Sequence, residues 1–106
     1  MGKPEHKVEG YLCDKAEAYG FLHYKFTSPG RRGVPDQLLI GRGHTVFIET
    51  KAPEGRLSEI QKRVIRKMRR KGADVRCCYT REAVDAFFEE ALTWPEYIPS
   101  ETDTAT

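Results

Sequence analysis

Two carboxylates and one amine lie close together in a stretch of sequence that is otherwise mostly apolar. The segment GVPDQLLIGRGHTVFIETK, residues 33–51, carries Asp36 near its start and Glu49 and Lys51 near its end. Alternate residues of a β-strand project to the same face about 7 Å apart, so Glu49 and Lys51 would point the same way. A turn around residues 41–44 would bring Asp36 back beside Glu49 in an antiparallel hairpin. The sequence therefore predicts two acids and a lysine at one end of a sheet.

This cluster has the composition of a site that hydrolyses phosphodiesters. Asp36, Glu49 and the backbone carbonyl of Thr50 offer the oxygen ligands that Mg²⁺ prefers, and Mn²⁺ is expected to substitute for it. Such an ion activates a bound water, and Lys51 can orient that water or stabilise charge on the phosphate. No His or Cys pair has the spacing of a zinc site. The alternative is an ion pair at a strand end, which needs no function.

The surrounding pattern predicts an α-β-β-β-α-β-α order. An amphipathic helix is expected over residues 8–19, and an aromatic strand over 21–27. The apolar face of the helix would be formed by Val8, Tyr11, Leu12, Ala16, Ala18 and Tyr19. The hairpin strands follow, and then a helix over 57–72, a strand over 73–80 and a helix over 81–92. Three sequential strands and a helical crossover into a fourth predict a mixed four-stranded sheet flanked by helices, an α/β (α+β) fold.

Length and composition indicate one compact domain. The chain has 106 residues, of which 1–98 are expected to form the domain and 99–106 a disordered tail. No apolar run reaches the length of a membrane span, and the N-terminal segment lacks a signal peptide's apolar core. Three cysteines without a disulfide or metal spacing favour small buried side chains in a reducing cytoplasm.

Basic residues gather in the helix over 57–72. Seven of the chain's 18 Lys and Arg lie between Lys62 and Lys71, with no acidic residue among them. Such a block can bind the phosphates of a nucleic acid without reading its sequence. Arg31 and Arg32, just before Asp36, could hold the phosphates beside the scissile bond. Both groups could instead simply be solvated. The residues of these two groups that we expect to contact DNA are Arg31, Arg32, Lys62, Arg66, Lys67 and Arg70.

The segments KFTSPGRRGVPD and VFIETKAPEGRLSEIQ resemble the VRR-NUC family of the PD-(D/E)XK nuclease superfamily. The family's pattern is Gly-x-Pro-Asp, Glu-x-Lys, Gly-x-Leu-Ser and then Gln, and the likeness extends from Val8 to about Leu92. Gln37 and Thr50 stand where basic and apolar residues are more usual. The resemblance implies a restriction-endonuclease-like core in which Asp36 and Glu49 hold the metal and Lys51 is catalytic.

The resemblance also implies two supporting residues. Gln61 matches a helix glutamine that reaches toward the active site, although the Ser58-x-x-Gln61 spacing alone predicts an N-terminal capping box. A glutamate of the first helix should join the site, and Glu9 matches better than Glu5.

Three hypotheses follow for the function. The resemblance implies a Mg²⁺-dependent endonuclease that cuts branched or four-way junction DNA as a homodimer, in the cytoplasm of a bacterial or phage-infected cell. A second hypothesis is a non-catalytic nucleic-acid-binding module that uses the basic helix 58–71. A third is a structural protein in which Glu49 and Lys51 form an ion pair. Only the first has a use for both acids and the lysine.

Overall fold

The computed structural model describes residues 4–99, with side chains from Lys7 onward. The predicted order of helices and strands is confirmed. Its elements are α1 (Pro4–Ala18), β1 (Leu22–Lys25), β2 (Gln37–Gly41), β3 (His44–Thr50), α2 (Glu59–Arg70), β4 (Asp74–Cys78) and α3 (Arg81–Ala91).

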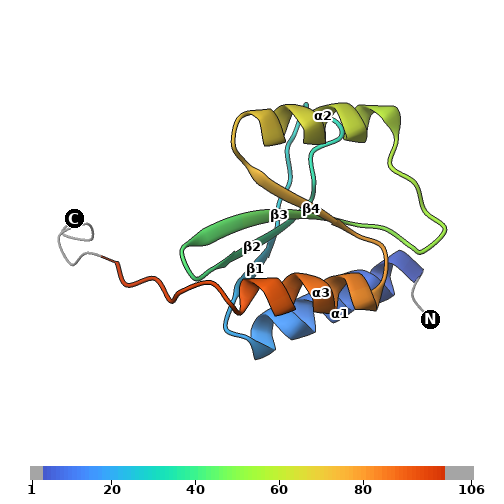
Figure 1. Ribbon diagram of the computed structural model, residues 1–106. Coiled ribbons are helices and arrows are strands. Elements are labelled where there is room, and N and C mark those ends of the chain that lie inside the picture. Colours follow the sequence, from blue (N-terminus) through green and yellow to red (C-terminus); the bar gives the residue numbers. More distant parts are fainter. Residues whose placement is uncertain (1–3, 100–106) are drawn as a thin grey trace.

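The four strands form one mixed sheet in the order β1-β2-β3-β4. The β1–β2 pair, joined by the loop over residues 26–36, and the β2–β3 pair, joined by a tight turn, are antiparallel, whereas β3 and β4 are parallel. The parallel pair requires the crossover that α2 supplies. Figure 1 shows α1 and α3 below the sheet and α2 above it. The predicted mixed sheet flanked by helices is thus confirmed.

The hairpin between β2 and β3 closes on a two-residue turn. Arg42 and Gly43 both have positive φ, 51° and 78°, as the type I′ turn of a tight hairpin requires. The turn sets the register, in which Gly41 pairs with His44 and Gln37 with Ile48. The end of the hairpin that carries Asp36 and Glu49 is therefore positioned by the turn at its opposite end.

The main core lies between the sheet and the pair α1 and α3. Leu39 and Val46 are directly opposite each other on this face and are fully buried. Apolar residues of the two helices cover them; these are Val8, Leu12 and Ala16 of α1 and Val84, Phe87, Phe88 and Ala91 of α3. On the other face, α2 contributes its buried Ile65 and β4 contributes Val75.

Several predicted boundaries and burials are wrong by a few residues. The first helix begins at Pro4 rather than at residue 8, and Ala18 and Tyr19 are exposed rather than in its apolar face. Here helix periodicity ends before the chain turns at Gly20, whose φ is 78°. The first strand covers only Leu22–Lys25, because the chain leaves the sheet into the proline- and glycine-rich loop.

Within residues 4–99, no helix is long and apolar enough to cross a membrane. The expected disorder of residues 99–106 concerns positions that, apart from Pro99, lie outside the described part of the chain.

Candidate active site

Asp36, Glu49 and Lys51 meet at one end of the sheet. Asp36 directly precedes β2, Glu49 is the next-to-last residue of β3, and Lys51 follows that strand. Since Gln37 pairs with Ile48, continuing the register by one residue sets Asp36 opposite Glu49. The predicted convergence of these three positions therefore follows from the observed hairpin register.

Glu49 and Lys51 form a partly buried charged pair. The carboxylate-bearing Glu49 is only 7% exposed, and its Oε2 lies 3.9 Å from Lys51 Nζ. That separation is longer than a hydrogen bond, so the attraction is mainly electrostatic. The backbone N–H of Lys51 donates to the carbonyl of Cys78 at 3.0 Å, which continues the parallel ladder and orients the lysine. Both side chains are consequently presented from a fixed backbone.

Asp36 is exposed, but its backbone is held in the sheet. Its carbonyl accepts a hydrogen bond from the Phe26 N–H at 2.7 Å, and the preceding Pro35 is buried. Its carboxylate Oδ1 accepts a bond of 3.3 Å from the side-chain nitrogen of Gln37. Asp36 is thus accessible to a ligand from solvent, and its backbone position lies beside that of the buried Glu49.

The donor set fits Mg²⁺ better than zinc. Asp36 and Glu49 supply carboxylate oxygens at adjoining strand ends, and Thr50, in the last position of β3, has its carbonyl in the same segment. No cluster of three or more His, Cys, Asp and Glu able to hold a metal occurs among the described side chains. A magnesium site here would combine two side-chain acids, the backbone carbonyl and water.

Cys77 lies beside Glu49 and was not predicted to be near the site. The two residues are partners in the parallel β3–β4 register. Burial raises the pKa of the Cys77 thiol, the nearby Glu49 carboxylate raises it further, and Arg69 opposes the shift. The raised pKa favours the neutral thiol next to the acid. The position of Cys77 beside Glu49 depends on the pairing of β3 with β4, which the sequence pattern did not predict.

Glu9 reaches the sheet from α1, where it forms an ion pair with β1. Its Oε1 lies 2.7 Å from Lys25 Nζ. In the register, Lys25 is opposite Gln37, the residue that follows Asp36. Glu9 therefore approaches the end of the sheet from the α1 side, and its part in catalysis stays a prediction. The alternative residue, Glu5, has a side chain outside the described part.

Gln61 forms the capping box that its spacing with Ser58 predicts. Its backbone N–H donates to Ser58 Oγ at 3.1 Å, and its side-chain oxygen accepts from the Ser58 N–H at 2.9 Å. These bonds satisfy two donors at the start of α2. The structural role of Gln61 is confirmed, and its catalytic role stays a prediction.

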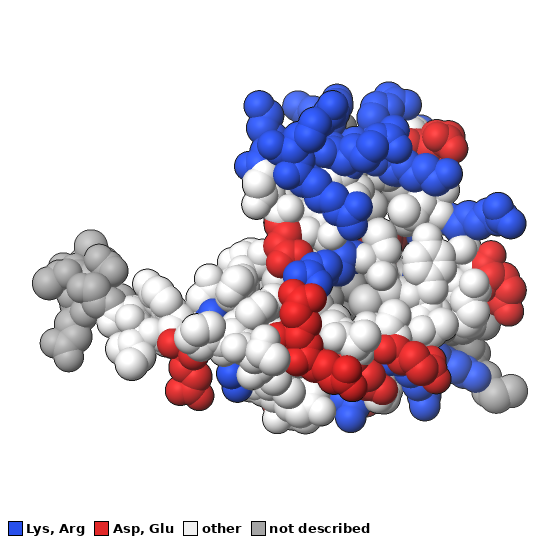
Figure 2. Space-filling view, viewed as in Figure 1, with Lys and Arg blue, Asp and Glu red and all other residues white. Residues whose placement is uncertain are grey.

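The predicted DNA-binding residues lie on α2 and on a loop that approaches the start of α2. Figure 2 shows many basic side chains gathered over α2, whereas most of the acidic ones visible on this face lie below it. The loop of Arg31 and Arg32 approaches the start of α2, because a Cβ on Gly33 would stand 2.7 Å from a side-chain carbon of Ile60. The six predicted contacts, Arg31, Arg32, Lys62, Arg66, Lys67 and Arg70, are all exposed.

Arg69 differs from its neighbours on α2. Its guanidinium donates twice to the Val75 carbonyl, at 3.1 and 2.7 Å. Arg69 therefore links α2 to β4 through hydrogen bonds. The basic residues of α2 that are predicted to bind DNA face the solvent.

A hollow of about 480 Å³ opens next to Lys51. It is lined by the loop that follows β3, together with Lys62 of α2 and Tyr79 after β4. The loop folds back on the lysine, since a Cβ on Gly55 would lie 3.3 Å from the Cβ of Lys51. Lys62, one of the predicted DNA-binding residues, therefore lies on the wall of a hollow whose loop contacts Lys51.

Comparison with known proteins identifies the family. The fold is similar to that of a solved structure described as a VRR_NUC domain, with a TM-score of 0.77 and 31% sequence identity. The match covers 83% of this chain and 97% of the solved chain. The sequence model of the VRR-NUC domain matches residues 13–82, which include Asp36, Glu49, Lys51 and Gln61. The chain belongs to the VRR-NUC domain family.

A phage protein is also similar to this VRR-NUC domain. It is named "Putative nuclease p44", from Acyrthosiphon pisum secondary endosymbiont phage 1, and is 46% identical over 50 residues. The matched region is 46% of this chain and 54% of that protein, so the chain spans about half the length of the curated relative.

Proposed function

We propose that this VRR-NUC domain is a Mg²⁺-dependent DNA endonuclease that hydrolyses phosphodiester bonds. The observation that carries the proposal is the meeting of Asp36, Glu49 and Lys51 at one end of the sheet. Membership of the family and the similarity to a phage protein named as a nuclease support it. A purely structural ion pair would explain Glu49 and Lys51, but it would leave the exposed Asp36 without a purpose.

In this mechanism the acids hold the metal and the lysine serves the reacting phosphate. Asp36, Glu49 and the carbonyl of Thr50 would bind Mg²⁺, with Mn²⁺ as a substitute. The ion, when bound, would lower the pKa of a coordinated water and polarise a phosphoryl oxygen. Lys51 would orient the attacking water and stabilise the negative charge that develops on the phosphate. Its partly buried position strengthens that interaction relative to one in water.

DNA would lie across the basic side of the molecule. Arg31 and Arg32 would hold phosphates next to the scissile bond, while Lys62, Arg66, Lys67 and Arg70 would bind the backbone farther away. Glu9 and Gln61 would support the site from α1 and α2. The preferred substrate would be branched or four-way junction DNA, in the cytoplasm of a bacterial or phage-infected cell. A homodimer would present two sites and cut two strands symmetrically.

The test is cleavage of end-labelled four-way junction, flap and linear duplex DNA in Mg²⁺, in Mn²⁺ and in EDTA. We expect metal-dependent cuts that are fastest in the branched substrates and that are lost in Glu49→Gln. Glu89→Gln, which alters an exposed glutamate of α3, is the matched control and should cut normally. Failure of the wild-type protein to cut any DNA, or undiminished cutting by Glu49→Gln, would exclude the proposed activity.

The exposed basic surface of α2 favours one rival function, nucleic-acid binding without cleavage. In that case Asp36→Ala would leave both the affinity for DNA and its Mg²⁺ response unchanged, and no product would form.

Sedimentation of the wild-type protein with and without junction DNA would measure its oligomeric state and so test the proposed homodimer.

A further inference from the structure

A buried amide links Asp36 to a histidine of the edge strand. Gln37 is 0% exposed, yet it carries a polar side chain in a row of apolar core positions. Its Oε1 lies 2.7 Å from His23 Nε2, and its Nε2 donates to Asp36 Oδ1 at 3.3 Å. The three side chains therefore form one hydrogen-bonded chain that ends at the exposed carboxylate.

The position of Gln37 would ordinarily favour an apolar residue. It is paired with Ile48, and Leu39 lies two residues along the same strand face, both fully buried against α1 and α3. Burying an amide without hydrogen-bond partners is unfavourable, because the amide loses its bonds to water and gains none in return. Both ends of the Gln37 amide are bonded, which offsets this cost and constrains the orientation of the group.

The direction of these hydrogen bonds, from His23 through Gln37 to Asp36, follows from the chemistry of the two end groups. An ionised Asp36 carboxylate can only accept hydrogen bonds, so the amide must turn its nitrogen toward it. The amide oxygen then faces His23, and His23 Nε2 must carry a hydrogen to donate. The opposite orientation of the amide would set two oxygens against each other at Asp36.

The bond also determines where the Asp36 carboxylate lies. Consecutive residues in a strand point to opposite faces. A bond between the side chains of Gln37 and Asp36 therefore requires both groups to bend toward the start of β2, where the two faces of the sheet meet. Asp36 is itself exposed, so close packing does not hold its side chain in that direction.

We propose that Gln37, oriented by His23, is a positioning residue that holds Asp36 ready to bind the metal ion. The inference rests on the proposed function, because it assumes that Asp36 is a ligand. Partners that orient a metal ligand typically contribute about 10- to 100-fold to metal affinity. The Gln37 bond would act in the same way, by reducing the number of directions open to the carboxylate before the ion arrives.

The experiment is Mn²⁺ binding without DNA, followed by electron paramagnetic resonance, for the full chain and its variants. Gln37→Met keeps the length of the side chain and removes both hydrogen bonds, and we expect it to weaken Mn²⁺ binding about 10- to 100-fold. His23→Leu should weaken it in the same direction. His23→Gln, which can donate a hydrogen bond to the Gln37 oxygen, should restore affinity toward that of the wild type.

Cleavage as a function of Mg²⁺ concentration provides a second measurement. In Gln37→Met the half-saturating concentration should rise, while the rate at saturating Mg²⁺ recovers most of the wild-type value. Leu39→Val, on the same face of the core, is the control for lost stability and should leave the metal dependence unchanged. His23 is only partly buried, so His23→Leu tests the inference even where Gln37→Met does not fold.

The outcomes separate the two proposals. A wild-type protein that binds Mn²⁺ and cuts DNA, with folded Gln37 and His23 variants of unchanged metal affinity, overturns the positioning role alone. A wild-type protein that neither binds Mn²⁺ nor cuts DNA overturns the proposed function and the positioning role together. Mn²⁺ binding that is weakened in Gln37→Met and in His23→Leu, and restored in His23→Gln, supports the positioning role of the hydrogen-bonded residues.

Discussion

Lys51 Nζ lies 3.9 Å from Glu49 Oε2, at the point where the antiparallel hairpin meets the parallel strand β4. Neither side chain is more than one-fifth exposed, and the backbone of Lys51 is bonded to β4. Glu49 therefore lies within β3, and Lys51, which follows the strand, is held to the end of β4 by its backbone. A backbone held in this way would let Lys51, in its proposed role, act on a phosphate without prior rearrangement.

Replacing this lysine should separate cleavage from binding. We expect Lys51→Ala to reduce the rate of DNA cleavage about 100-fold or more, because charge on the phosphate loses its stabilising group. Junction affinity in Ca²⁺ should change little, since the exposed arginines and lysines remain. Single-turnover rates and gel-shift titrations measure the two quantities. A variant that binds no DNA would show instead that Lys51 acts in binding.

The basic surface of α2 should account for the salt dependence of DNA binding. Arg66→Gln with Arg70→Gln is expected to weaken binding to every DNA and to lower the slope of log affinity against log salt by up to about 1.8. The matched control is Lys15→Gln with Arg81→Gln, which removes the same charge from α1 and α3. Equal losses in the two double variants would mean that only net charge matters.

Ser58 and Gln61 allow the capping role to be separated from a catalytic one. Ser58→Ala removes the hydroxyl that accepts the Gln61 N–H, and it should lower the free energy of unfolding by about 1 kcal/mol. Gln61→Ala should lower stability by a similar amount, because it removes the other half of the box. Urea titrations measure this loss. If Gln61 also serves the active site, Gln61→Ala will slow cleavage well below the rate of Ser58→Ala at equal folded fraction.

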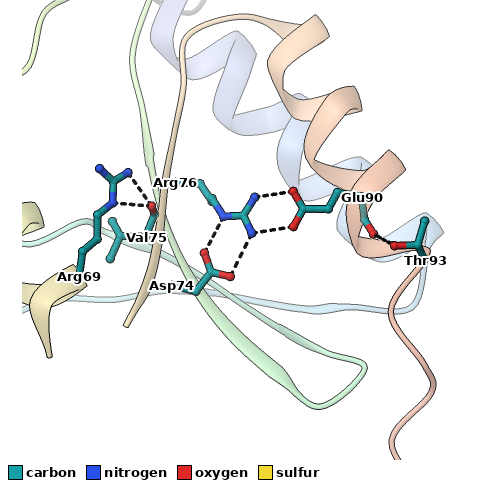
Figure 3. Close-up of polar contacts among 6 residues, drawn as sticks. All are labelled: Arg69, Asp74, Val75, Arg76, Glu90 and Thr93. Carbon is teal, nitrogen blue, oxygen red and sulfur yellow. Dashed lines mark hydrogen bonds and ion pairs between the residues drawn. The ribbon is translucent and has the colours of Figure 1, made fainter. Parts of the chain in front are cut away.

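Glu90 should make stability depend on pH through Arg76. Figure 3 shows the Arg76 guanidinium between Asp74 and Glu90, with Arg69 bonded to the neighbouring Val75 carbonyl. The hydrogen bonds from Arg76 hold the pKa of the Glu90 carboxyl below its ordinary value. A carboxyl with a lowered pKa in the folded state stabilises the protein above its unfolded pKa of about 4.3. That contribution is lost as the pH falls through the lowered value.

The measurement is the difference in unfolding free energy between the wild type and Glu90→Gln. We expect the wild type to be the more stable at pH 7 and the difference to shrink toward zero as the solution is acidified below pH of about 4. Glu89→Gln removes one charge from the neighbouring position and is the control. A difference that grows on acidification would contradict the inferred direction of the pKa shift.

Two glycines should respond in opposite ways to the same substitution. A Cβ on Gly41 would collide with the ring of Phe21, and Gly41→Ala should destabilise the hairpin by about 1–3 kcal/mol. Gly10, inside α1, has open space around a new Cβ, so Gly10→Ala should stabilise the helix by about 0.5–1 kcal/mol. Thermal melts of both variants test this contrast, and two changes of the same sign would refute it.

Much of the fold could be predicted because it depends on local chemistry. The turn at Arg42 and Gly43, the capping box at Ser58 and the apolar periods of the helices involve residues that are close in the chain. The meeting of Asp36 with Glu49 needs only the hairpin register, which the turn itself sets. The ends of β1 and α1 were less predictable, because pairing and packing with distant segments decide where regular structure stops.

The candidate site shows the same difference between local and distant contacts. The types and order of Asp36, Glu49 and Lys51, and the strands that present them, follow from spacing and pattern. The partners of individual polar groups do not. His23 bonds to Gln37, 14 residues away, and Glu9 of α1 pairs with Lys25 of β1. Such pairs form only where the packed helices and strands bring donors and acceptors within about 3 Å, a distance that no local pattern encodes.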